Sequence, residues 1–308
     1  MHRACCPGLI PEVYLYDEEE HNIVMEDMKG YENLRYELCA HRIFPQLAED
    51  VADFCGRALI GTTDMIVGAE KKKDLVRHFT NPKLCEITER HVLTEPYWED
   101  LDDNGVMPEN DEFMHTHIYG DEELHARVGM LKSVFETKAQ ALLHGDLHSG
   151  SVFVTPDMTC ILDPEFAFYG PVGYDTGNFI ANMIFAYANG LYTMEDGGDK
   201  SAYLDWVLAV IEDFCDIFRS RAAALIKEKS QERQTRNDQK NQQGLCLADF
   251  CLRYFYRLYI FCPGISSRSR HDPVCSDAAS WCRSSVRIRS RCRAQLLHRC
   301  CRRMYIYR

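Results

Sequence analysis

The chain has 308 residues, 46% hydrophobic and 27% charged, which is enough for a full core in one large or two smaller domains. No window reaches the 18 or so apolar residues of a membrane span, and the first twenty residues lack a signal-peptide core, so we expect a cytosolic protein with no membrane partner. The formal net charge is −12. Residues 261–308 carry eleven Arg and two Asp, a charge of +9, so residues 1–260 carry −21. This negative charge excludes nucleic acid as a partner of residues 1–260.

The opening segment predicts a β-hairpin. Residues 13–16 and 23–25 are apolar or aromatic, and they flank a polar turn at residues 17–22. A helix should follow from about residue 44, with Pro45 in its first turn and apolar residues at helical spacing: Leu47, Val51, Phe54 and Ala58. Residues 62–104 indicate short helices and loops.

Four more helical regions follow the same periodicity rule. One has apolar residues at 124, 128, 131 and 135 and extends toward residue 142; a long apolar one runs from about 173 to 187; two others cover 202–218 and 222–229. Residues 227–246 form a polar segment that we expect to be a loop. The fifteen cysteines are mostly scattered singly, and we expect reduced, buried thiols at Cys39, Cys55, Cys85, Cys160 and Cys215.

The segment from residue 142 to 165 carries the chemistry. It predicts a strand, a polar loop His144-Gly145-Asp146-Leu147-His148, a second strand at 152–154 and a third at 160–162 that ends in Asp163-Pro164-Glu165. Asp146 has no packing reason to lie between two apolar strands, and its carboxylate can orient an acceptor hydroxyl and take its proton. If Asp163 and Glu165 follow strand alternation, both face one side, where their oxygens suit Mg²⁺.

Each of these residues also has a plainer interpretation. An Asp after Gly is commonly a turn residue, and a D-P-E triplet alone is commonly a loop. Their joint occurrence, in order and with strands between them, favours a phosphoryl-transfer site. We expect His144 and His148 to be structural, and Asp175 to cap the helix that it begins while bracing the loop of Asp146.

The string HGDLH followed by a strand and D-x-[DE] resembles the aminoglycoside phosphotransferase and choline kinase branch of the protein-kinase-like fold. The longer string HGDLHSGSVFV…ILDPEFAFYGPVGYDTGNFIANMIFAY is closely similar to the 5-methylthioribose kinases, and the similarity covers roughly residues 8–220. The resemblance implies an α+β, protein-kinase-like fold, mainly the helical C-terminal lobe with a remnant N-terminal β-hairpin. Residues 1–28 would be the remnant and hinge, 29–226 the lobe, 227–246 the polar loop, and 247–308 a divergent Arg- and Cys-rich segment, disordered from 261.

The resemblance further implies transfer of the ATP γ-phosphate to the anomeric hydroxyl of methylthioribose, a step of methionine salvage. Asp146 would be the base, Asp163 and Glu165 would hold Mg²⁺, Pro164 would lie between them, and Glu26, Asp27 and Met28 would form the hinge that binds adenine. Family members are often homodimers.

We expect the chain to lack the glycine-rich loop and strand lysine that grip the phosphates in kinases, and we find no substrate arginine pair in context. Two alternatives therefore stay open. One is a kinase-derived chain without catalytic activity, and the other is a related kinase that acts on choline, homoserine or an aminoglycoside.

Overall fold

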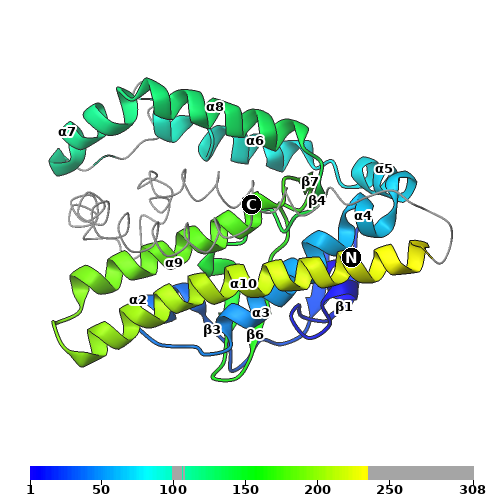
Figure 1. The fold of residues 1–308 in the computed structure, drawn as a ribbon, viewed down its shortest axis with the longest axis horizontal. Coiled ribbons are helices and arrows are strands. Elements are labelled where there is room, and N and C mark those ends of the chain that lie inside the picture. Colours follow the sequence, from blue (N-terminus) through cyan, green and yellow to red (C-terminus); the bar gives the residue numbers. More distant parts are fainter. Residues whose placement is uncertain (99–105, 107, 235–308) are drawn as a thin grey trace.

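The fold is described from a computed structural model, which covers residues 1–98, 106 and 108–234 (Figure 1). The expectations for residues 235–308 lie outside this part. The helices are α1 (His2–Cys5), α2 (Leu34–Cys39), α3 (Leu47–Phe54), α4 (Asp64–Val67), α5 (Ala69–His78), α6 (Pro82–His91), α7 (Asp111–Met114), α8 (Glu122–Thr137), α9 (Gly173–Thr193) and α10 (Gly198–Gln234). The strands are β1 (Val13–Asp17), β2 (Asn22–Met25), β3 (Glu32–Asn33), β4 (Ala141–Leu142), β5 (Val152–Val154), β6 (Thr159–Ile161) and β7 (Tyr169–Gly170).

The predicted hairpin is confirmed. Strands β1 and β2 pair antiparallel, with a register irregularity between Val13 and Leu15. The Asp17 carboxylate shapes the turn by accepting the backbone N–H groups of Glu19 and Glu20 at 3.1 and 3.0 Å. Apart from Asp17, the side chains of both strands are exposed.

The core lies among α3, α9 and α10, and Figure 1 shows α10 running along both of the other helices. Leu47, Val51 and Phe54 repeat at helical spacing, so α3 buries them on one face. The helical path continues through a π-helical turn, Cys55–Leu59. From α10, the ring of Phe214 packs 4.8 Å from that of Phe179 in α9, centroid to centroid.

Several helix boundaries differ from the sequence prediction. Helix α3 begins at Leu47 rather than near residue 44, and Pro45 lies in a turn before the helix, closed by the hydrogen bond from Leu47 N–H to Phe44 O at 3.2 Å. Helix α8 ends at Thr137 rather than near residue 142, because the Gln140 N–H donates to Gly170 O at 3.0 Å and the chain then enters β4. Residues 202–229 form one helix rather than two, since nothing between Phe218 and Ala222 breaks a helix. Helix α10 also extends through residues 227–234, where the sequence indicated a loop.

Two small sheets position the loop of Asp146. Strand β4 pairs with β7, and β5 pairs with both β3 and β6, all antiparallel. The loop lies between the end of β4 and the start of β5. Cys55 and Cys160 carry buried free thiols, as predicted, whereas the free thiol of Cys85 is only half-buried. Within the described ranges, no helix is long and apolar enough to cross a membrane.

Candidate active site

The loop after β4 is fixed by a buried histidine. His144 Nε2–H donates to Leu162 O at 2.7 Å, and His144 Nδ1 accepts the Asp146 N–H at 3.3 Å, so both ring nitrogens are used by a neutral imidazole. Burial lowers the pKa of His144 to about 4, which keeps the ring neutral at physiological pH. His144 is therefore structural, as its sequence position indicated.

A glycine lets the chain turn directly before Asp146. Gly145 has φ +88°, and an added Cβ would lie 2.2 Å from Phe166 O. Any L-residue would therefore be strained in conformation and would clash with backbone. The close approach holds Asp146 next to the segment that carries Asp163 and Glu165.

Asp175 braces the same turn from α9. Its Oδ2 accepts the His144 N–H at 2.7 Å and its Oδ1 accepts the Gly145 N–H at 3.0 Å. The bracing role is confirmed, but the predicted capping role is wrong, because α9 has no side-chain cap and Asp175 lies inside its first turn. The carboxyl group is fully buried, and burial raises the pKa of Asp175 to about 7 against the effect of the two amide donors.

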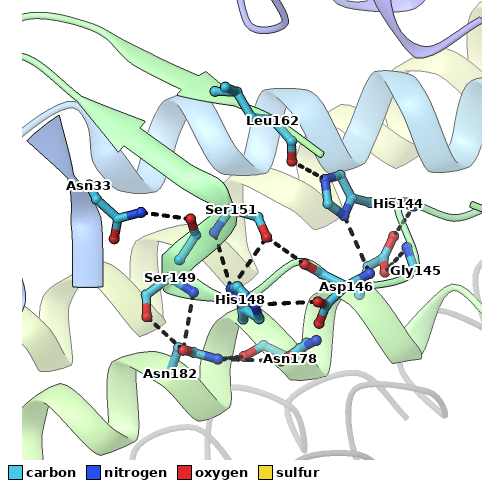
Figure 2. Close-up of polar contacts among 12 residues, drawn as sticks. Asn33, His144, Gly145, Asp146, His148, Ser149, Ser151, Leu162, Asn178 and Asn182 are labelled. Atoms are coloured by element: carbon cyan, nitrogen blue, oxygen red, sulfur yellow. Dashed lines mark hydrogen bonds and ion pairs between the residues drawn. The ribbon is translucent and has the colours of Figure 1, made fainter. Parts of the chain in front are cut away.

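The Asp146 carboxylate is partly exposed and faces His148 (Figure 2). His148 Nε2 lies 3.3 Å from Asp146 Oδ2, while His148 Nδ1 accepts the Ser151 N–H at 3.1 Å. The second contact leaves the ring proton on Nε2, where it points at the carboxylate. Ser151 Oγ–H closes the loop by donating to Asp146 O at 3.0 Å.

Side chains from two other elements hold this loop, and sequence reasoning missed them. Asn182 Oδ1 in α9 accepts both the N–H and the Oγ–H of Ser149, at 3.1 and 2.8 Å. Asn182 is held in turn by Asn178 O at 2.9 Å, and Asn33 Nδ2–H donates to Gly150 O at 2.7 Å (Figure 2). Two asparagines at positions i and i+4 inside an otherwise apolar helix are a signal that could have revealed the first pair.

The Asp163-Pro164-Glu165 segment lies beyond the strand rather than in it. Strand β6 ends at Ile161, and Asp163 has φ +63°, so the expectation from strand alternation that both carboxylates face one side does not apply. Both side chains are exposed. Local desolvation, followed by the negative charges of Asp163 and Asp146, raises the pKa of Glu165, so Glu165 lies within electrostatic reach of both aspartates.

A magnesium ion fits this donor set by its chemistry. Among the described residues no group of three or more His, Cys, Asp or Glu side chains is arranged to hold a metal ion. Mg²⁺ needs fewer protein ligands, because it commonly takes one or two carboxylates together with water and phosphate oxygens. Asp163 and Glu165 are exposed hard-oxygen donors whose mutual repulsion a cation would relieve.

The segment Glu26-Asp27-Met28 follows β2. The Glu26 N–H donates to Glu12 O at 2.7 Å, and Met28 O accepts the Tyr31 N–H at 3.0 Å. Burial, followed by the charge of Glu26, raises the pKa of Cys160 to about 12, so this segment lies near β6. No hydrogen bond between described residues uses the Met28 N–H or the Glu26 carbonyl.

Together, the helical lobe with small sheets and a carboxylate on a braced loop define a phosphotransferase of kinase-like fold. Residues 10–202 match the family described as "Phosphotransferase enzyme family", and the chain belongs to it. A solved structure of glucosamine kinase, crystal form B, has a TM-score of 0.50 and 13% identity, and the match covers 94% of this chain and 67% of that one.

Curated relatives give a finer comparison. The chain is 37% identical over 251 residues to methylthioribose kinase of Escherichia coli O45:K1 (strain S88 / ExPEC), which covers 81% of this chain and 60% of the relative. It is 38% identical over 228 residues to methylthioribose kinase 1 of Oryza sativa subsp. japonica, which covers 73% and 52%. The chain thus spans about half the length of the curated relatives that it matches, from 44% to 60%.

Proposed function

We propose that this chain carries the catalytic loop of a kinase that phosphorylates S-methyl-5-thioribose on its anomeric hydroxyl, using ATP, as a step of methionine salvage. The observation that carries the proposal is a part-exposed Asp146 carboxylate on a loop whose backbone N–H groups donate to Asp175. The chain that carries this loop is 37% identical to a methylthioribose kinase. The loop supports phosphoryl transfer as the reaction, and the relatives support the sugar as the acceptor.

Asp146 would act on the acceptor. Its carboxylate accepts a hydrogen bond from the hydroxyl that will be phosphorylated and takes the proton as the oxygen–phosphorus bond forms. The bond between the γ-phosphorus and the bridging oxygen breaks at the same time, and ADP leaves. His148 Nε2–H holds one carboxylate oxygen, and the other stays available for the acceptor.

Asp163 and Glu165 would hold the magnesium ion, which neutralises phosphate charge when it is bound. The exposed Glu165 carboxylate is within electrostatic reach of both Asp163 and Asp146, which favours a shared site. The Met28 N–H and the Glu26 carbonyl, unused among the described hydrogen bonds, would pair with the edge of the adenine, with Asp27 between them.

The test is a single assay on the purified chain. With ATP, Mg²⁺ and methylthioribose we expect the sugar 1-phosphate and ADP to form in equal amounts, which ³¹P NMR measures. Choline, homoserine and an aminoglycoside serve as competing acceptors in parallel reactions. Product from one of these alone would overturn the choice of sugar, and no product from any acceptor, with circular dichroism of a folded protein, would overturn activity for this chain.

A further inference from the structure

Helix α2 begins against the loop of Asp146. Its N-cap residue, Asn33, accepts the Arg35 N–H on Oδ1 at 3.0 Å and donates from Nδ2 to Gly150 O at 2.7 Å. One side chain therefore caps the helix and ties it to the loop. Figure 2 shows Asn33 directed toward that loop. This link places Arg35, in the first turn of α2, beside residues 148–150.

Glycine at position 150 leaves room for the Arg35 guanidinium. A Cβ built on Gly150 would lie 3.0 Å from Arg35 Nη2 and 2.6 Å from His148 Cε1. The guanidinium and the imidazole are thus neighbours above the same backbone atom. His148 therefore lies close to the Arg35 guanidinium and also contacts the candidate base, since His148 Nε2 is 3.3 Å from Asp146 Oδ2.

The charge of Arg35 is not compensated within the part of the chain that the structure describes. The residue is exposed, and its guanidinium takes part in no ion pair or hydrogen bond there, although its backbone N–H is bonded. By contrast, Arg42 pairs with Glu37 at 3.1 Å. Arg35 therefore presents a planar set of donors, the geometry that binds phosphate oxygens in pairs.

The other charged side chains of the candidate site are carboxylates. The negative charges of Asp163 and Asp146 both act on Glu165, and no described Lys or Arg side chain pairs with any of these three carboxylates. A polyphosphate entering this site needs positive charge on more than one side, because a metal ion held by two carboxylates leaves part of the phosphate charge unbalanced. Arg35 is a cation that the fold places beside His148, the residue that contacts the candidate base.

We propose that Arg35 is a phosphate-binding residue of this site, which contacts phosphate oxygens of the nucleotide beside His148. The inference deepens the proposed function and rests on it for the identity of the nucleotide. The ligand chemistry that it assigns is a polyphosphate anion, bound through a charge-assisted pair of N–H···O hydrogen bonds.

Binding measurements test this without turnover. Isothermal titration of the full chain with ADP, adenosine and inorganic tripolyphosphate, each with Mg²⁺, should give a phosphate-specific pattern. For R35Q we expect Kd for ADP and for tripolyphosphate to rise about tenfold or more, with Kd for adenosine unchanged. R35K keeps the charge but not the paired geometry, so its Kd values for ADP and tripolyphosphate should lie between those of the wild type and R35Q. R42Q is the matched control and should bind all three ligands like the wild type.

The outcomes separate this inference from the proposed function. Equal losses for ADP and adenosine in R35Q would mean that Arg35 supports the fold or the nucleoside, and would overturn a phosphate contact. Unchanged Kd values for ADP and tripolyphosphate would also overturn it, as would a wild-type chain that binds neither. A chain that forms no sugar phosphate but binds tripolyphosphate through Arg35 would remove the proposed reaction and leave the phosphate site standing.

Discussion

His148 Nε2 lies 3.3 Å from Asp146 Oδ2, and the opposite ring nitrogen of His148 accepts the Ser151 N–H. The second contact fixes the tautomer, so the proton on Nε2 faces the carboxylate. One histidine therefore orients the candidate base and is itself oriented by the loop that carries that base. The arrangement gives His148 a role that its sequence context did not reveal, since a histidine in a polar loop was expected to be structural.

Replacing the candidate base removes the proton acceptor but not the scaffold. In D146N we expect kcat for sugar phosphorylation to fall by about 10³-fold, the range typical for loss of a general base. The backbone contacts of residue 146 to His144 and Ser151 do not involve the carboxylate, so the melting temperature should stay close to that of the wild type. D157N, in the exposed turn between β5 and β6, is the control, and a D146N enzyme that kept most of its rate would remove Asp146 as the base.

Replacing His148 tests orientation rather than proton transfer. In H148L the Asp146 carboxylate loses its hydrogen bond from the ring, and the Ser151 N–H keeps only the His148 carbonyl as an acceptor at 3.0 Å. We therefore expect kcat to fall about tenfold with a smaller change in KM. H148Q can still donate to Asp146 and should recover part of the rate. Steady-state kinetics on both variants measure this difference. An equal loss of kcat in H148L and H148Q would indicate that the imidazole contributes by packing and not by its hydrogen bond to Asp146.

The sequence predicted what depends on local pattern. Two short runs of apolar or aromatic residues around a polar turn identified the hairpin, and the order of strand, HGDLH loop and strand placed Asp146 in a loop between strands. The contacts that hold this loop join residues far apart in the chain, such as Asn33 to Gly150 and Ser149 to Asn182. Periodicity says nothing about which side chains meet across such distances, so these residues were missed.

Two local rules were overridden by tertiary contacts. An Asp at the start of a helix commonly caps it, yet the buried N–H groups of His144 and Gly145 take both oxygens of Asp175. Alternation predicted one face for Asp163 and Glu165, but Asp163 adopts a left-handed conformation just past the end of β6, which an Asp side chain tolerates.

The two exposed carboxylates should govern the magnesium requirement. For D163N and for E165Q we expect the Mg²⁺ concentration that gives half-maximal ADP binding to rise by at least about tenfold, because each change removes a hard anionic oxygen. Titration calorimetry at varied Mg²⁺ measures this without turnover. E195Q, an exposed glutamate after α9, should match the wild type, and an unchanged Mg²⁺ dependence in both site variants would remove these residues as ligands.

Asp175 should contribute strongly to the free energy of unfolding through its two buried hydrogen bonds. D175A leaves the buried N–H groups of His144 and Gly145 without acceptors, so we expect a loss of about 3 kcal/mol in the free energy of unfolding. D175N keeps one acceptor oxygen but turns an amide N–H₂ toward a backbone donor, and it should lose a similar amount. Urea unfolding compares both with D205N on the exposed face of α10, and a loss of less than about 1 kcal/mol would contradict the bracing role.

The free energy of unfolding should depend on pH through three buried titratable groups. His2 and His144 act in one direction, and Asp175 acts in the other. Burial lowers the pKa of both His2 and His144 to about 4, so the unfolded chain binds two protons that the folded chain lacks between pH 4 and 6.5. Their stability contribution is complete above pH 6.5 and is lost as the pH falls toward 4. Burial raises the pKa of Asp175 to about 7, and its contribution is instead complete below about pH 4 and lost as the pH rises through 7.

Substitution of His2 isolates one of these protons. In H2L the unfolded chain binds one proton fewer, so the difference in unfolding free energy between variant and wild type should change by about 1.4 kcal/mol per pH unit between about pH 4.5 and 6. Loss of the hydrogen bond from His2 Nε2 to Leu142 O at 3.2 Å adds an offset that does not vary with pH. Urea unfolding at four pH values separates slope from offset, with H21Q on the exposed hairpin turn as control. Parallel curves for H2L and wild type would mean that His2 is protonated in the fold, because only a neutral buried ring produces the difference in slope.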